Sequence, residues 1–235
     1  MKKVANAWGK TSVPGCEPEH NQTEGPRLVM RPIEREDLPQ VADIHLLAFP
    51  DAAVSIMGHE VARRFYESLL YGPQKHVGYG AFVDGQLSGY VFGGRPTEAE
   101  RDYLRSNVGY LIWRLLTHPW LLFRGRVMNR LLLSLRVLVR LQPKTPPKPV
   151  PSLELLGQCF GIQAIAVDPR RRRVGVGRVL LVAAEKAARK DGLTTMLLSV
   201  HGSNRAAVKF YLTTGWYGYP KGSPWDGGFM LRDLN

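Results

Sequence analysis

The chain has 235 residues, enough to bury a hydrophobic core that is stable without disulfides or bound metal ions. Its net charge of +12 favours an anionic partner. A phosphorylated cofactor, nucleic acid and an acidic membrane surface would all meet that condition. Two cysteines, Cys16 and Cys159, are too few for a disulfide framework and favour a reducing, cytoplasmic compartment. No apolar core of a signal peptide appears in residues 1–25, and arginines interrupt each apolar stretch before it reaches the length of a membrane-spanning helix.

The first part of the chain predicts a strand, two helices and a hairpin. Residues 1–26 show no regular pattern, and we expect a disordered or loosely attached arm there. Asp84-Gly85 suits a two-residue turn, and Asp37 is the candidate N-cap of the first helix. The expected elements are a strand at Leu28–Arg31, helices at Asp37–Phe49 and His59–Tyr71, and strands at Tyr79–Val83 and Gln86–Phe92.

The composition changes in an insertion at residues 95–155. Between Arg95 and Glu154 there are eleven Lys and Arg against four Asp and Glu. At 100° per residue, polar side chains between Arg126 and Arg140 share one side of a helix that is otherwise mostly Leu and Val, which predicts a basic amphipathic helix. Three interpretations stay open for the insertion: a helical hairpin packed on the domain, a contact with an anionic membrane surface, or a roof over the acceptor cleft.

The last part of the chain returns to alternating strands and helices. The expected elements are a strand at Phe160–Val167, a basic loop at Asp168–Gly177, a helix at Val179–Lys190, a strand at Met196–Val200, a helix at Asn204–Thr213, and closing strands at Trp216–Tyr219 and Phe229–Leu231. The whole order predicts an α/β (α+β) domain, from residue 27 to residue 235, with a central mixed sheet flanked by helices.

The segment from Val167 to Gly177 is a strand end, a basic turn and a helix start. Its glycines let a ligand approach the backbone, and the helix start offers unpaired N–H groups, so the turn can hold a pyrophosphate. It is neither a Walker A loop, which ends in Gly-Lys-Ser/Thr, nor a dinucleotide fingerprint, which needs a third glycine where Val179 and Leu180 stand.

The segment instead resembles motif A of the GNAT superfamily of N-acetyltransferases, whose Gln/Arg-x-x-Gly-x-Gly/Ala pattern falls on Arg172, Gly175 and Gly177. Downstream, the run from Asn204 to Trp216 is similar to the family's Asn-x-x-Ala-x-x-Phe-Tyr-x-x-x-Gly-aromatic segment. The resemblance covers Leu28–Gly93 and Phe160–Leu231. It implies the GNAT fold, with the helical insertion between the third and fourth strands.

The resemblance also implies direct acyl transfer from acetyl-CoA to an amine, with no covalent enzyme intermediate and no metal. Backbone groups at Ile165 and Val167 would pair with the pantetheine arm, Asn204 would contact the cofactor arm, and Tyr211 would protonate the departing thiolate. The implied cofactor-binding set is Ile165, Ala166, Val167, Arg172, Arg173, Val174, Gly175, Val176, Gly177, Arg178, Asn204 and Tyr211.

The general base stays open at this point. The strand Phe160–Val167 has no acidic residue, and Ser199 stands where many relatives carry Glu. Glu154, just before that strand, and His201, at the end of the next, are the candidates. An imidazole can accept a proton near neutral pH, which suits His201.

Each site residue also has a plainer interpretation. Arg170 to Arg173 could be a solvated turn, Tyr211 a core aromatic residue, His201 a turn residue and Asn204 a helix N-cap. We expect a small amine or amino-sugar-like acceptor, with anionic and lipid-linked acceptors left open, and no nucleic-acid partner. The alternatives are a protein N-terminal or lysine acetyltransferase, a non-catalytic acyl-CoA-binding regulator, and a membrane-surface or nucleic-acid-binding module. A location peripheral to the inner membrane surface also stays open.

Overall fold

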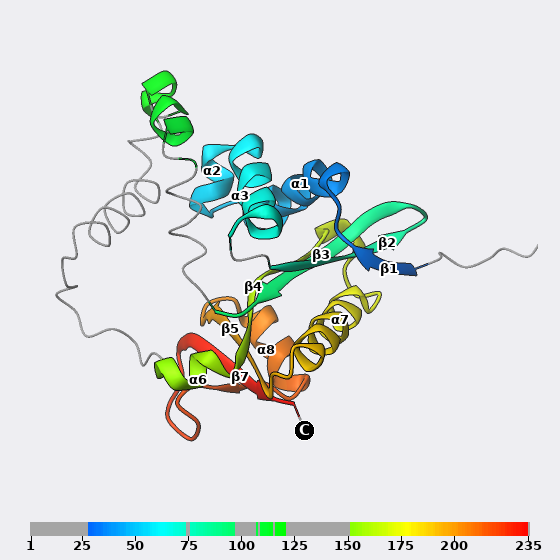
Figure 1. The fold of residues 1–235 in the computed structure, drawn as a ribbon, viewed down its shortest axis with the longest axis vertical. Helices are drawn as coiled ribbons and strands as arrows, with labels where there is room; N and C mark the ends of the chain where they lie inside the picture. The colour runs from blue at the N-terminus through cyan, green and yellow to red at the C-terminus, as the bar shows by residue number, and fades with distance from the viewer. Residues whose placement is uncertain are drawn as a thin grey trace, which may run out of the picture.

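The computed structural model describes residues 28–73, 76–96, 107, 109–114, 116–120 and 151–234. The expected N-terminal arm and the expected amphipathic helix between Arg126 and Arg140 lie outside these residues. The described part folds around one seven-stranded sheet with the order β1-β2-β3-β4-β5-β7-β6 (Figure 1).

The sheet is mixed. Its strands are β1 (Leu28–Pro32), β2 (Val77–Val83), β3 (Gln86–Gly94), β4 (Cys159–Val167), β5 (Thr195–His201), β6 (Tyr217–Gly218) and β7 (Gly227–Asp233). Only the β4–β5 pair is parallel, and the other neighbours are antiparallel. The predicted central mixed sheet is therefore confirmed.

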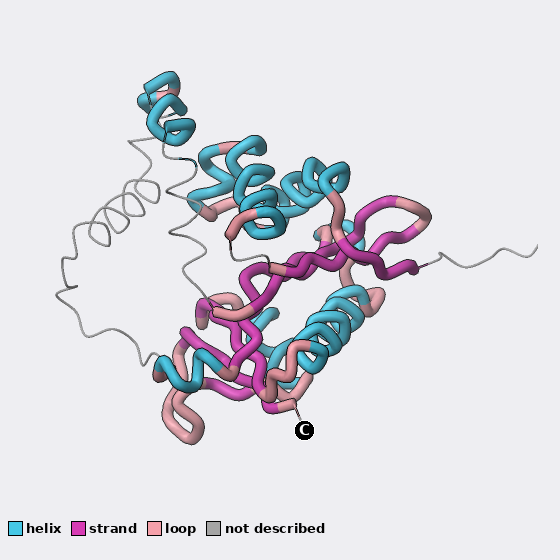
Figure 2. The backbone as a smooth tube through the Cα atoms, viewed as in Figure 1, coloured by secondary structure: helices cyan, strands magenta, loops and turns pink. Residues whose placement is uncertain are grey.

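Helices cover both faces of this sheet. They are α1 (Leu38–Ala48), α2 (Ala53–Met57), α3 (His59–Tyr71), α6 (Leu153–Gly157), α7 (Val176–Lys190) and α8 (Arg205–Thr213), with short 3-10 helices η1 (Arg35–Asp37) and η3 (Pro169–Arg171). Helices α1 to α3 lie on one side of the strands and α7 and α8 on the other, as the backbone trace makes plain (Figure 2).

The apolar spacing of the sequence explains both layers. Along α7, the buried side chains are Val176, Leu180, Leu181, Ala184, Ala187 and Ala188, a stripe along one side of the helix. This stripe packs with Phe160, Met196 and Met230 of the strands. On the opposite face, Leu38, Val41 and Tyr66 pack with Tyr90 and Phe92. Each face of the sheet thus has its own core, and the strands hold the two together.

Asp37 is the N-cap residue of α1, as the sequence predicted, but its side chain makes no capping hydrogen bond to that helix. Its carboxylate accepts a hydrogen bond from the Glu34 backbone N–H at 2.9 Å and from Arg31 at 2.6 Å, while no side-chain hydrogen bond caps α1. The Asp37 side chain instead accepts these hydrogen bonds from Arg31 of β1 and from Glu34, the N-cap residue of η1. This 3-10 helix lies between β1 and α1 and was not predicted from the sequence.

Part of the insertion packs on the domain. The described residues among 107–120 are largely helical, and Leu111 joins Met57 and Val61 in a small buried cluster. The Arg114 Nε donates to the Met57 carbonyl at 3.2 Å. On the same segment Ile112, Trp113, Leu116 and Trp120 are each more than half exposed. Among the residues that the structure describes, no helix has the length and apolar character needed to span a membrane.

Candidate active site

The two central parallel strands run side by side only at their beginnings. Cys159, Phe160 and Gly161 of β4 pair with Thr195, Met196 and Leu197 of β5. Beyond Gly161, β4 keeps its ladder with β3, and β5 keeps its ladder with β7. The two inner edges have no strand between them there, so they offer backbone N–H and C=O groups to an extended ligand.

A bulge in β4 lies at the point where the strands separate. Phe92 of β3 pairs with Ala164 and Gly93 pairs with Ile162, which leaves Gln163 as an extra, exposed residue. The bulge shifts the alternation of β4 by one residue. Ile162 and Ile165 both contact the core under α7, whereas Ala164 and Ala166 contact the core under α1 and α3.

The end of β4 leads into the loop from Arg172 to Gly177, which the sequence predicts to bind an anion. Gly175 has φ +84° and is the N-cap of α7, whose first helical residue is Val176. Among the described residues, the backbone N–H groups from Arg172 to Gly177 find no backbone acceptor. A helix start with free N–H groups attracts phosphate, and the exposed Arg172, Arg173 and Arg178 add positive charge around it.

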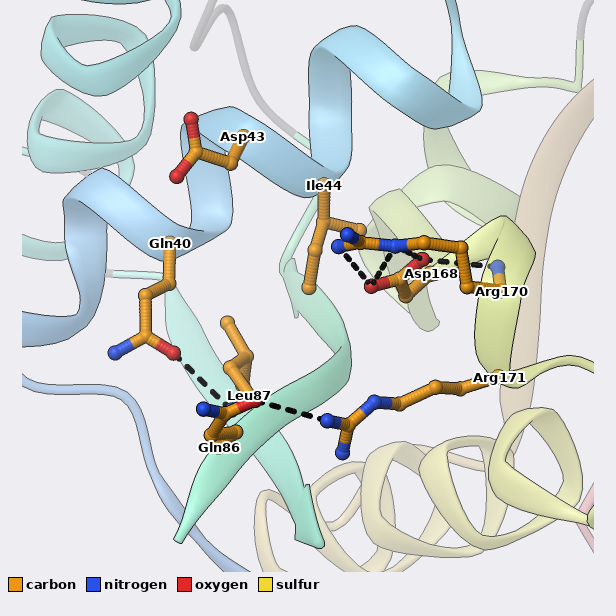
Figure 3. A pocket seen from close by; sticks show the side chains of 8 residues that line it. All are labelled: Gln40, Asp43, Ile44, Gln86, Leu87, Asp168, Arg170 and Arg171. Atoms are coloured by element: carbon orange, nitrogen blue, oxygen red, sulfur yellow. Dashed lines mark hydrogen bonds and ion pairs between the residues drawn. The ribbon is translucent and has the colours of Figure 1, made fainter.

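The four consecutive arginines have different environments. Arg170 makes a bidentate ion pair with Asp168, with the shortest N–O distance 2.7 Å. This hydrogen-bonded arginine lowers the pKa of Asp168, although burial of the carboxylate opposes the shift. Arg171 points toward the β2–β3 turn, where it donates to Gln86 Oε1 at 2.9 Å (Figure 3). Arg172 and Arg173 are exposed and have no side-chain partner among the described residues.

A cavity of about 390 Å³ lies behind this loop, on the side of α1 (Figure 3). Its walls come from Gln40 and Asp43 of α1, from the β2–β3 turn, and from Asp168 to Arg171. It adjoins the loop through residues already engaged in internal hydrogen bonds. The separation of β4 and β5 and the free N–H groups, rather than this cavity, therefore define the candidate cofactor site.

Tyr211 lies on α8 with 7% of its surface exposed, against Trp216 and Phe210. Burial raises its pKa to about 12. Its hydroxyl has no hydrogen-bond partner among the described residues, so the proton is available to a ligand. The core interpretation and the acid interpretation are compatible, because the ring is buried while the phenol keeps its proton at neutral pH.

Asn204 is the N-cap of α8. Its side-chain oxygen accepts from the Ala207 N–H at 3.3 Å, which is the structural role considered from the sequence. The residue is exposed, and its amide NH₂ stays available for a ligand. It lies three residues after the end of β5, and its backbone N–H donates to the His201 carbonyl at 2.9 Å.

The two candidate bases lie at opposite ends of the parallel pair. Glu154 is exposed on α6, before the paired start of β4, whereas His201 is exposed at the end of β5. Thr195 pairs with Cys159 at the start of β4, and His201 lies six residues further along β5. Six residues of strand span about 20 Å, so His201 is about that far along the strands from the paired start that α6 precedes. His201 Nδ1 is 2.7 Å from Ser203 Oγ and also accepts the Ser203 N–H at 3.3 Å.

Gln163 is the site residue that the sequence analysis missed. Strand alternation puts Ser199 and His201 on the face opposite Leu198 and Val200, which contact the core under α7. Both are exposed, as is Gln163 at the bulge. The signal was present, because Gln163 is the one polar side chain in an otherwise apolar strand. Its position at the separation of the strands depends on the bulge.

Comparison with known proteins agrees with this geometry. Residues 141–216 match the model of the acetyltransferase (GNAT) family, and this range contains both the anion-binding loop and Tyr211. No curated protein matches the sequence at a significant level. Many solved structures share the fold.

Three of these structures illustrate the likeness. The PaiA N-acetyltransferase of Thermoplasma acidophilum, in complex with coenzyme A, is 14% identical with a TM-score of 0.51, covering 88% of this chain and 99% of that one. A ribosomal-protein-alanine N-acetyltransferase from Brucella melitensis is 16% identical, TM-score 0.51, with 88% and 99% covered. An N-acetyltransferase from Staphylococcus aureus Mu50 is 15% identical, TM-score 0.51, with 89% and 99% covered. At these identities the likeness concerns the fold.

Residues 141–216 are thus similar in sequence to the acetyltransferase (GNAT) family, and the mixed, separating sheet is similar in fold to the solved acetyltransferases.

Proposed function

We propose that the protein transfers the acetyl group of acetyl-CoA to the amine of a small acceptor, such as an amino sugar. The observation that carries this proposal is the separation of β4 from β5 beyond Gly161 and Leu197, which leads to the free N–H groups at Arg172–Gly177. An extended, anionic donor fits such an arrangement, because one strand edge can bind its arm and the helix start can bind its phosphates.

Acetyl-CoA supplies a thioester whose carbonyl carbon accepts the amine. In our proposal, the backbone from Ile165 to Val167 pairs with the arm of the donor along the free edge of β4. The loop N–H groups and the side chains of Arg172, Arg173 and Arg178 hold the pyrophosphate. Binding along the edge fixes the thioester beside the bulge at Gln163, where the two strands begin to separate.

The proposed chemistry needs one base and one acid. His201 accepts the proton that the attacking amine must lose, either directly or through a water. As the new C–N bond forms and the C–S bond breaks, Tyr211 gives its phenolic proton to the departing sulfur. The raised pKa of Tyr211, about 12, supports this role because the phenol is protonated at neutral pH.

The acceptor is proposed to approach from the face that carries Gln163, Ser199 and His201. These exposed side chains are hydrogen-bonding groups, and none of them is a carboxylate that would select a basic peptide. The net charge of +12 further favours an acceptor that bears an anionic group, such as a phosphorylated amino sugar, over a lysine-rich protein.

The test is calorimetric binding of acetyl-CoA to the wild type, to Gly175→Glu and to Gly192→Glu. Both glycines have positive φ, +84° and +69°, and an added Cβ would meet nothing within 4 Å at either. The two variants therefore share the backbone strain, but only the carboxylate that Gly175→Glu introduces would lie in the loop and repel the pyrophosphate. We expect the wild type and Gly192→Glu to bind and Gly175→Glu not to bind.

The second half of the test is a panel of amines assayed by thiol release. Turnover of amino sugars or similar small amines supports the proposal. Turnover restricted to peptide N-termini or lysines would replace it with a protein acetyltransferase. Donor binding with no turnover of any amine would instead favour a non-catalytic acyl-CoA-binding regulator.

A second proposal concerns the insertion. We propose that residues 107–120 touch an anionic membrane surface and bring the enzyme to lipid-linked acceptors. The support is the exposed apolar set Ile112, Trp113, Leu116 and Trp120. Residues 107–120 contain one arginine, Arg114, and lie within the longer insertion, where Lys and Arg outnumber Asp and Glu by seven between Arg95 and Glu154.

Co-sedimentation with vesicles tests this contact. A Trp113→Ser/Trp120→Ser variant is compared with Leu47→Ser/Leu212→Ser, which removes exposed apolar side chains from α1 and α8. We expect only the first variant to lose binding to vesicles that contain anionic lipid. Equal binding by both variants would remove the segment from any membrane contact.

A further inference from the structure

The turn at Asp168–Arg171, which leads into the phosphate loop, is hydrogen-bonded to the β2–β3 hairpin. The Asp168 backbone N–H donates to the Ser88 carbonyl at 2.9 Å, and Asp168 and Ser88 are both buried. The Asp168 carboxylate also accepts from the Arg170 backbone N–H at 2.9 Å, which caps η3. The end of β4 is thus fixed before the chain turns toward the loop.

The side chain of Arg171 makes a second set of hydrogen bonds to the same hairpin (Figure 3). Its guanidinium donates to Ser88 Oγ at 3.0 Å, to the Val83 carbonyl at 3.3 Å and to Gln86 Oε1 at 2.9 Å. These acceptors all lie in or beside the β2–β3 turn, 83 to 88 residues earlier in the chain. The guanidinium of Arg171 is therefore directed into the protein, away from any bound phosphate.

The loop that follows needs such support. Arg173 has φ +69°, a left-handed conformation that a side chain with a Cβ rarely adopts and that costs about 1–2 kcal/mol. A strained residue keeps such a conformation only when its surroundings hold it. Helix α7 holds the chain on one side of Arg173, and the Arg171 contacts hold it on the other.

Packing does little to replace those contacts. The cavity of about 390 Å³ lies between α1, the β2–β3 turn and the Asp168–Arg171 turn, so side chains do not fill this junction. If the Arg171 guanidinium were removed, the hydrogen bonds of Asp168 would be the contacts that still hold the start of the loop, among the described residues. Hydrogen bonds to a charged group are also among the stronger ones in proteins.

We infer that Arg171 is a positioning residue for the donor site: it ties the phosphate loop to the β2–β3 turn and so presets the N–H groups that bind the pyrophosphate. This inference rests on the proposed function, because it assigns the same loop to the donor. Arg171 itself does not contact the donor, and Gln86 and Ser88 contribute to donor affinity from a turn outside the site.

The test combines donor binding with a ligand-free measurement. Arg171→Ala should weaken acetyl-CoA binding by about tenfold, and the loss should appear in KM more than in kcat. Arg171→Lys keeps the charge but cannot make the forked contacts, so it should lose most of the same affinity. Lys186→Ala, on the exposed side of α7, removes one positive charge elsewhere and should bind as the wild type does.

Without ligand, amide hydrogen exchange at residues 172–177 should be faster in Arg171→Ala than in the wild type. Gln86→Ala, an exposed substitution in the turn, should shift both measurements in the same direction if Arg171→Ala proves too unstable to study. Its effect should not add fully to that of Arg171→Ala, because the two residues share one contact.

Three results would overturn the inference. The first is unchanged amide hydrogen exchange in the loop of folded Arg171→Ala. The second is wild-type acetyl-CoA affinity in that variant. The third is wild-type acetyl-CoA affinity in Arg171→Lys, because the effect of Arg171 would then be one of charge alone. Failure of the wild type to bind acetyl-CoA would refute the proposed function and this inference together. Wild-type binding that Arg171→Ala leaves unchanged would refute the inference alone.

Discussion

Gly161 and Leu197 form the last pair across the parallel strands β4 and β5. Gln163 bulges out two residues later, and from there each strand bonds only to its outer neighbour. The free edges arise from an irregularity in the ladder rather than from an added element. The candidate site made this way lies between two strands in the middle of the sheet order.

Tyr211→Phe tests the proposed acid. The phenyl ring keeps the contacts with Phe210 and Trp216 but has no proton to give, so we expect kcat to fall about a hundredfold or more while acetyl-CoA affinity stays unchanged. Stopped-flow detection of thiol release measures the first quantity and calorimetry the second. Tyr217→Phe, whose hydroxyl donates to Asp233 on the sheet edge, is the matched control. An unchanged rate in Tyr211→Phe would exclude this residue from proton transfer.

The pH profile gives an independent check on the same residue. With a pKa of about 12, the phenol of Tyr211 stays protonated up to about pH 11. A loss of activity that sets in between pH 8 and pH 10 and vanishes in Tyr211→Phe would contradict the environment that the structure gives this hydroxyl.

His201→Asn and Glu154→Gln distinguish the two candidate bases. We expect His201→Asn to lower kcat/KM by a factor of about 10² to 10⁴, since a positioned base contributes about that much. Glu154→Gln should remain close to the wild type, because α6 packs at the paired start of the strands and not where they separate. Steady-state kinetics with a saturating amine decide the matter, and the reverse ranking would make Glu154 the base.

The layout of the domain could be predicted because its signals are local. The α3 helix has the predicted bounds His59–Tyr71, since its apolar residues recur at helical spacing. The predicted turn at Asp84-Gly85 is also present, with φ of +52° and +77°. By contrast, α2 and α6 have only five residues each, too few to show a helical period.

The details of the site could not be predicted, because they depend on contacts between distant segments. Nothing near Arg171 in the sequence distinguishes it from its three neighbours, and its partners lie 83 to 88 residues earlier. The Gln163 bulge likewise follows from the pairing of β4 with β3 and not from the composition of β4. Sequence patterns located the loop, and tertiary contacts assigned a different environment to each arginine.

Arg173→Gly should separate strain from charge in the loop. Glycine accepts φ +69° without penalty, so we expect the ligand-free protein to gain about 0.5–1 kcal/mol of unfolding free energy while its acetyl-CoA affinity falls. Arg172→Gly is the control: it also removes one arginine, but φ at Arg172 is −75°, so glycine should lower the stability instead. Thermal denaturation compares the two, and a destabilised Arg173→Gly would show that the side chain stabilises the loop.

The last prediction concerns His45, a buried residue of α1. Its Nδ1 is 2.8 Å from the Tyr66 hydroxyl, which is 2.7 Å from the Tyr90 hydroxyl. Burial lowers the pKa of His45 to about 4. The unfolded chain, with an ordinary histidine pKa near 6.5, binds this proton first, so protonation favours unfolding. Stability from this group is therefore complete above about pH 6.5 and declines as the pH falls toward 4, by up to about 3 kcal/mol.

His45→Phe should flatten this dependence. The phenyl ring can keep the packing against Phe49 but takes up no proton, so the variant should be less stable than the wild type at pH 7.5 and should lose less stability between pH 7 and pH 5. Urea denaturation at each pH measures both. His76, also buried with a lowered pKa, titrates in both proteins and cancels in the comparison. Parallel curves for the two proteins would mean that His45 takes up no additional proton on unfolding, contrary to its burial.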